Sequence, residues 1–222
     1  ELIRPVFAVL DPGLTFTLSS KQLSYGAADM MSHVMERYFT SIKNVDLTDR
    51  LCEATLKTVM ENALLALEDL EDYNPRAELM WAGNLAHNGL LNTGRIGDWG
   101  PHKIAHELST YCGIAHGGAI AIIFPAWMKY VYKKDIDMFY KFAVRVFNVD
   151  PCFGTRESIA LKGIEKLIAF FKSLGIPMSL KDIGAGEEGF EGMAEKAMLF
   201  GPIGGYIELN KQDVLSIYKL TL

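Results

Sequence analysis

Residues 98–125 read DWGPHKIAHELSTYCGIAHGGAIAIIFP and contain three of the five histidines of the chain, at positions 102, 106 and 116. His102 and His106 are four residues apart, so on a helix they lie on one face, one turn from each other. Gly113 is suited to end that helix, because glycine adopts the left-handed conformation at low cost. The chain then restarts at His116 with an apolar run, which predicts a second helix that begins beside the first two imidazoles. Three converging imidazoles are typical of a site for a divalent transition metal.

A second pair of metal-binding side chains occurs on the helix predicted over residues 23–39, which Ser19 or Ser20 can cap. Asp29 and His33 are also four residues apart, and three small residues precede them. Alone, the pair would indicate only local pairing with a half-buried histidine. Together with the three later histidines it indicates a shared site. The spacing therefore offers five candidate ligands for one four-coordinate metal and does not say which one to omit.

Several other chemical signals are weaker. His87 has no partner at helical spacing and is predicted to be a hydrogen-bonded histidine of the core or of a groove. Cys112 is predicted to pack as a small apolar side chain, although it follows His106 closely enough to raise the question of a nucleophile. Residues 184–189 (GAGEEG) match the dinucleotide pattern GxGxxG, but no strand precedes them and two glutamates would repel a pyrophosphate. The zinc-protease pattern HExxH is begun at His106 and broken by Thr110.

The rest of the pattern is helical after one strand-like run at residues 2–10, which a DPG turn closes. The apolar helix that begins at His116 is predicted to continue over residues 126–132, and further helices are predicted over residues 46–69, 75–91, 135–147, 155–174, 188–200 and 211–220. A single strand has no neighbour to pair with, so we expect it to belong to a sheet upstream; an edge strand lying on the helices is the alternative. The expected organisation is a strand and link at 1–13 and an all-α, metal-binding catalytic domain at 14–222.

Composition excludes several classes of protein. The 222 residues carry a net charge of −5 and no Lys/Arg-rich stripe, so nucleic acid is not expected as a partner. Cys52, Cys112 and Cys152 are odd in number and widely spaced, which predicts reduced thiols and a cytoplasmic protein. No apolar run reaches the roughly 18 residues that a membrane span needs, and no signal peptide is recognised, so no membrane partner is expected.

The chain resembles the iron-containing (group III) alcohol dehydrogenase family over nearly its whole length. The resemblance lies in Asp29-x-x-x-His33, in His102-x-x-x-His106, and in His116 followed by glycine and an apolar helix. The opening residues 5–22 (PVFAVLDPGLTFTLSSKQ) look like the family's link into its helical C-terminal domain. Residues 91–109 (LNTGRIGDWGPHKIAHELS) are similar to the NAD(P)H-dependent butanol dehydrogenase branch.

The resemblance implies the role of each site residue. Asp29, His33, His102 and His116 correspond to the metal ligands of the family. His106 corresponds to an active-site histidine that is not a ligand and lies by the nicotinamide and the substrate. The implied cofactors are Fe(II) or Zn(II) in this domain and NAD(P)H in the full-length protein, bound by an α/β domain upstream. The general affinity order favours zinc over iron, so the occupying metal would depend on supply.

The implied function is that of an NAD(P)-dependent alcohol dehydrogenase or aldehyde reductase, in which the metal polarises the alcohol or carbonyl oxygen during hydride transfer. A small alcohol or aldehyde is the expected substrate, a homodimer is compatible with the resemblance, and this chain alone is expected to be inactive without the upstream domain. Two alternatives are a stand-alone helical domain stabilised by metal and a lyase related to dehydroquinate synthase, whose kin usually have glutamate where Asp29 stands.

Overall fold

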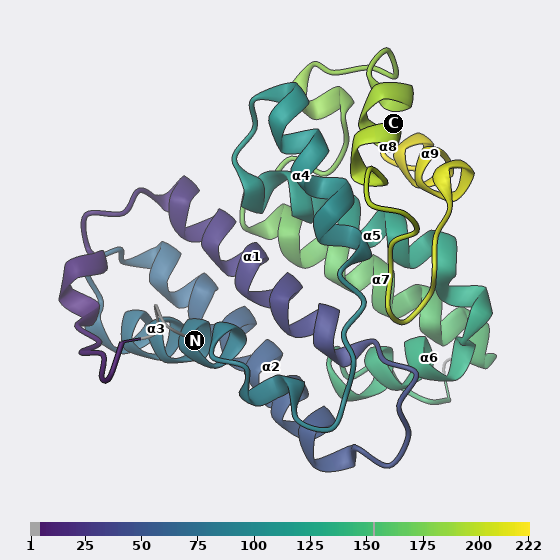
Figure 1. Ribbon diagram of the computed structural model, residues 1–222. Coiled ribbons are helices and arrows are strands. Elements are labelled where there is room, and N and C mark those ends of the chain that lie inside the picture. Colours follow the sequence, from purple (N-terminus) through teal and green to yellow (C-terminus); the bar gives the residue numbers. More distant parts are fainter. Residues whose placement is uncertain (1–4, 153) are drawn as a thin grey trace.

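The computed structural model describes residues 5–152 and 154–222, and this described part is helical (Figure 1). Its α-helices are α1 (Ser20–Tyr38), α2 (Asp46–Glu68), α3 (Tyr73–His87), α4 (Gly100–Cys112), α5 (His116–Val131), α6 (Ile136–Arg145), α7 (Arg156–Ser173), α8 (Phe190–Ala197) and α9 (Lys211–Lys219). Short 3-10 helices lie at Pro12–Thr15, Leu90–Asn92, Tyr132–Lys134 and Lys181–Ile183. The predicted all-α fold class is confirmed.

Two helix ends lie at the capping residues that the sequence indicated. Ser19 caps α1, because its hydroxyl accepts a hydrogen bond from the Gln22 amide at 3.3 Å. Gly113 ends α4 in the left-handed region, with φ of 66°. Several helix ends differ from the prediction by one to three residues, and the largest difference is in α3, which ends at His87, four residues before the predicted end at residue 91. The cause is Gly89, which takes a φ of 91° and breaks the helical hydrogen bonding.

The predicted N-terminal strand is wrong for the part of it that the structure describes. Residues 5–10 are irregular and exposed, and residues 2–4 lie outside the described residues. Over 5–152 and 154–222 there is no strand, and only an isolated bridge pairs Ile203 with Leu209. A lone strand leaves its backbone donors and acceptors without partners, so residues 5–10 gain nothing from strand geometry in this chain.

Helix α1 lies at the centre of the packing (Figure 1). It contacts α2 and α3 on one side and α5 on the other, while α5 in turn packs on α4, α7 and α9. An aromatic cluster seals the end of α1: the Phe39 ring stacks on Phe139 at 4.8 Å and lies 5.5 Å from Trp127. These side chains are fully buried. They fix where α1 meets α5 and so where the N-terminal half of α1 lies relative to the start of α5.

None of the helices in the described residues combines the length and the apolar character needed to cross a membrane. The three cysteines are unpaired, and Cys52 is buried, Cys112 is half-buried and Cys152 is exposed.

Candidate metal centre

Three helices bring the predicted site residues together. Asp29 and His33 come from α1, His102 and His106 from α4, and His116 is the first residue of α5. The start of α5 lies directly against α1: a Cβ on Gly117 would collide with the Tyr25 carbonyl oxygen. The absence of a side chain at residue 117 is therefore what lets His116 approach Asp29.

The distances divide the candidate ligands into two sets that share Asp29. Ligand atoms of Asp29, His102 and His116, which we call the His102 set, all lie within 4.8 Å of one another. Its Asp29 Oδ1 is 4.0 Å from His102 Nε2 and 3.3 Å from His116 Nε2. Asp29, His33 and His87, which we call the His87 set, meet the same distance criterion. His33 belongs only to the His87 set, although its ring centroid lies 4.4 Å from that of His102.

The polar atoms at the centre of the site lack partners. Asp29 Oδ1, His102 Nε2 and His33 Nδ1 are buried and make no hydrogen bond. Burying such atoms unpaired costs about 1–3 kcal/mol each, and a bound cation would remove that cost. Burial lowers the pKa of His33 to about 3 and that of His102 to about 4, so both rings are neutral at pH 7 with a lone pair free. These residues fit a divalent metal.

Glu36 is a site residue that the sequence analysis did not identify. It is fully buried on α1, and its Oε1 lies 2.7 Å from His102 Nδ1 and accepts a hydrogen bond from the His102 amide at 3.0 Å. Its Oε2 accepts from the Trp99 amide at 2.6 Å. Burial raises the pKa of Glu36 to about 8, while the backbone amides of His102 and Trp99 that it accepts from favour the charged form. In that form the carboxylate places the ring proton of His102 on Nδ1 and turns Nε2 toward Asp29. The sequence contains one indication of this role: residues 29, 33 and 36 lie on the same face of a helix, so Glu36 shares the face that carries Asp29 and His33.

The start of α4 is strained at the point where Glu36 holds it. Trp99, its N-terminal cap, takes a left-handed backbone with φ of 65°, which is uncommon for a residue other than glycine. The Trp99 ring lies 5.3 Å from the His102 ring and 5.6 Å from the His33 ring. Trp127, by contrast, is fully buried in the core. Of these two tryptophans, only Trp99 borders the site.

His106 and His87 flank the site without joining the His102 set. The exposed His106 ring lies 4.7 Å from the His116 ring, one helical turn beyond His102. The sequence predicted His87 to lie in the core or in a groove, but it is exposed and contacts the His33 ring at a centroid distance of 4.1 Å. The prediction that His87 is hydrogen-bonded holds for one nitrogen, because Nδ1 donates to the Gly83 carbonyl at 2.7 Å.

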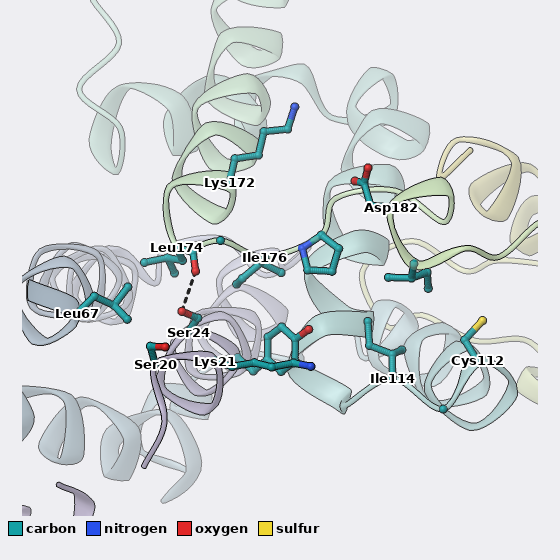
Figure 2. A pocket seen from close by; sticks show the side chains of 15 residues that line it. Ser20, Lys21, Ser24, Leu67, Cys112, Ile114, Lys172, Leu174, Ile176 and Asp182 are labelled. Carbon is teal, nitrogen blue, oxygen red and sulfur yellow. Dashed lines mark hydrogen bonds between the residues drawn. The ribbon is translucent and has the colours of Figure 1, made fainter. Parts of the chain in front are cut away.

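A cavity of about 870 Å³ lies apart from these histidines, between the start of α1, the end of α4 and the end of α7 (Figure 2). Lys21, Lys172 and Asp182 line it, and none of the candidate metal ligands does. The hydrogen bond that Ser24 donates to the Leu174 carbonyl at 2.8 Å ties α1 to the end of α7 at this point. Because it contains no histidine and no unpaired buried polar atom, this cavity is separate from the metal centre.

Comparison with known proteins identifies the family of this chain. The sequence profile described as "Fe-containing alcohol dehydrogenase family, C-terminal" matches residues 24–222. The chain belongs to this family. The match disagrees with the alternative of a lyase related to dehydroquinate synthase.

Members of the Fe-containing alcohol dehydrogenase family are similar to the chain over its whole length. Probable NADH-dependent butanol dehydrogenase 1 of Bacillus subtilis is 44% identical over 221 residues, which cover 100% of this chain and 57% of that protein. NADH-dependent butanol dehydrogenase A of Thermotoga maritima, a solved structure, has a TM-score of 0.89 at 38% identity and covers 95% of this chain and 55% of its own. The aldehyde reductase YqhD of Escherichia coli gives 0.94 at 31%, with 99% and 58% covered. The chain thus spans little more than half the length of these relatives.

We expect substitution of Glu36 to weaken metal binding in this family member. Both carboxylate oxygens of Glu36 accept hydrogen bonds from backbone amides. Glu36→Gln replaces one of these oxygens with an N–H₂ group, which faces a backbone N–H and cannot accept its hydrogen bond. Loss of such supporting groups typically lowers metal affinity about 10–100-fold. Competition titration of Zn²⁺ against a chromophoric chelator measures the change in Kd.

The matched control is Glu53→Gln. Glu53 is also buried, but its carboxylate accepts from the Tyr38 hydroxyl at 3.0 Å and contacts Arg145 instead of a histidine. The control should keep the zinc Kd of the unchanged protein. Equal Kd values for the two variants would show that Glu36 does not orient His102.

Proposed function

We propose that this chain is the metal-binding part of an NAD(P)H-dependent enzyme that interconverts small alcohols and aldehydes. Asp29, His33, His102 and His116 would hold one divalent ion, Fe(II) or Zn(II). The observation that carries the proposal is a pair of buried polar atoms without hydrogen-bond partners, Asp29 Oδ1 on α1 and His102 Nε2 on α4, which lie 4.0 Å apart. Membership of a dehydrogenase family supports the reaction class, and the names of the relatives support NADH or NADPH as the coenzyme.

The residues of the chain would prepare the site in two ways. A bound divalent ion supplies a Lewis acid that polarises the alcohol or carbonyl oxygen. Asp29 neutralises half of the charge of that ion, so the site keeps a net positive charge for an oxygen substrate. Glu36 holds the ring of His102 in the orientation that presents Nε2.

His106 is proposed to move the alcohol proton. Its ring lies beside His116 at the exposed rim of the site, between the candidate ligands and solvent. Burial lowers the pKa of His106 below its usual value, which keeps it neutral and able to accept a proton at pH 7. Trp99 would exclude water on the side of the site formed by His33 and His102.

Metal analysis of the purified protein tests the proposal. Protein equilibrated with Zn²⁺ or Fe²⁺ and then dialysed should retain close to one equivalent of metal per chain by atomic emission. Asp29→Asn should retain far less, because Asp29 is the one residue common to both ligand sets. Absence of retained metal in the unchanged protein would contradict the proposed function.

A further inference from the structure

His87 lies beside the candidate metal centre and is not used by the proposed four-ligand site, although one of its ring nitrogens is within 4.8 Å of ligand atoms of Asp29 and His33. Its Nδ1 pairs with a carbonyl oxygen, Gly83 O, which can only accept. Nδ1 is therefore the protonated nitrogen, and the lone pair of the neutral ring lies on Nε2, the form that binds metals. The ring is exposed at the end of α3 and touches His33.

The His87 set has the composition and the spacing of a cation site. One carboxylate and two imidazoles, with solvent in the remaining position, suit zinc and chemically similar divalent ions. The two oxygens of Asp29 face different partners: Oδ1 faces His102 and His116, whereas Oδ2 lies 3.8 Å from His33 Nε2. One carboxylate can thus serve either set without changing its own position.

The two sets differ in their access to solvent. The His87 set contains the exposed His87 and a His33 side chain that is 19% exposed. The His102 set contains a His116 side chain that is 32% exposed and a His102 side chain that is only 7% exposed and is held by Glu36. The His87 set therefore offers an arriving ion an imidazole at the surface, whereas the His102 set includes an imidazole that is buried and held in place by Glu36. The surface imidazole suits capture of the ion, and the buried, oriented imidazole suits its retention.

We propose that Asp29, His33 and His87 form a second divalent-cation position, from which the ion passes to the His102 set. Asp29 stays bound throughout, while His87 is exchanged for His102 and His116. The proposal rests on the proposed metal-binding function. It adds His87 as a ligand for loading and release of the ion.

Loading kinetics on the metal-free protein test this proposal. His87→Leu should slow the binding of Zn²⁺, followed by stopped-flow competition with a fluorescent chelator, by about tenfold, which corresponds to a loading barrier higher by about 1.4 kcal/mol. Release should slow by the same factor, because a position on the path changes both rates and leaves the equilibrium Kd nearly unchanged. His106→Leu is the matched control: it also removes an exposed histidine that touches the cluster, but one that belongs to neither set.

A second measurement isolates the His87 set. The double variant His102→Ala/His116→Ala lacks both imidazoles of the His102 set and should still bind one Co²⁺ per chain, more weakly than the unchanged protein. Adding His87→Leu should abolish that binding, with circular dichroism monitoring the fold. Equal rates of zinc binding in His87→Leu and His106→Leu would overturn the proposal. It would also be overturned if the double variant bound Co²⁺ equally well with and without His87. Failure of the unchanged protein to bind any divalent ion would instead overturn the proposed function itself.

Discussion

Replacing His102 with alanine should weaken zinc binding about 100-fold. A four-ligand zinc site contributes roughly 10–16 kcal/mol, so one ligand accounts for about 3 kcal/mol. His102 is also the ligand that Glu36 orients, and its Nε2 is buried without any other partner. Isothermal titration with Zn²⁺ against a competing chelator measures the change in Kd.

The same substitution should lower the stability of the zinc-bound protein. Metal that binds only the folded state stabilises it according to RT ln(1 + [L]/Kd), so a 100-fold weaker Kd costs about 2.7 kcal/mol at saturating zinc. For a chain of this size the melting temperature should fall by roughly 5–10 °C. Differential scanning calorimetry with and without zinc separates this loss from any effect on the metal-free fold.

His106→Ala serves as the comparison, because His102 and His106 lie one turn apart on α4 and are chemically identical. It should keep both the zinc Kd and the melting temperature of the unchanged protein. If His106→Ala lost its metal while His102→Ala kept it, the roles assigned to the two histidines would be reversed.

Turnover should depend on His106 even though metal binding does not. In the full-length enzyme, His106→Ala is expected to slow aldehyde reduction by about 10²–10⁴, the usual cost of losing a general acid–base group. The physical reason is the place of His106 at the exposed rim beside His116, where it links the site to solvent. Steady-state rates, with metal content measured on the same samples, give the result.

Partial recovery of this activity by added imidazole would support proton transfer, since a small base can occupy the space of the missing ring. Thr110→Ala, one turn further along α4 and also exposed, is the control and should leave turnover unchanged. Full activity of His106→Ala at normal metal content would remove His106 from the reaction.

The sequence by itself determined where the helices lie and which candidate site residues each helix carries. Ser19 and Gly113 mark helix ends through local backbone chemistry, which needs no tertiary contact. The pairs at spacing four, Asp29 with His33 and His102 with His106, follow from helix periodicity alone. Family resemblance then separated His106 from the four proposed ligands, a choice that spacing had left open. The strand predicted at residues 2–10 was wrong over residues 5–10, since strand geometry depends on a partner that local sequence does not supply.

Only the tertiary structure decided how these residues meet. Glu36 and His102 are 66 positions apart, and their contact depends on where α4 crosses α1, which no periodic pattern records. The approach of His116 to Asp29 depends on Gly117 lying against the Tyr25 carbonyl. His87 has no spacing partner in the sequence and reaches the centre because α3 packs on α1. Helical periods fix which side chains share a face, whereas the packing of one helix on another fixes which faces meet. The candidate metal centre lies where three such faces converge.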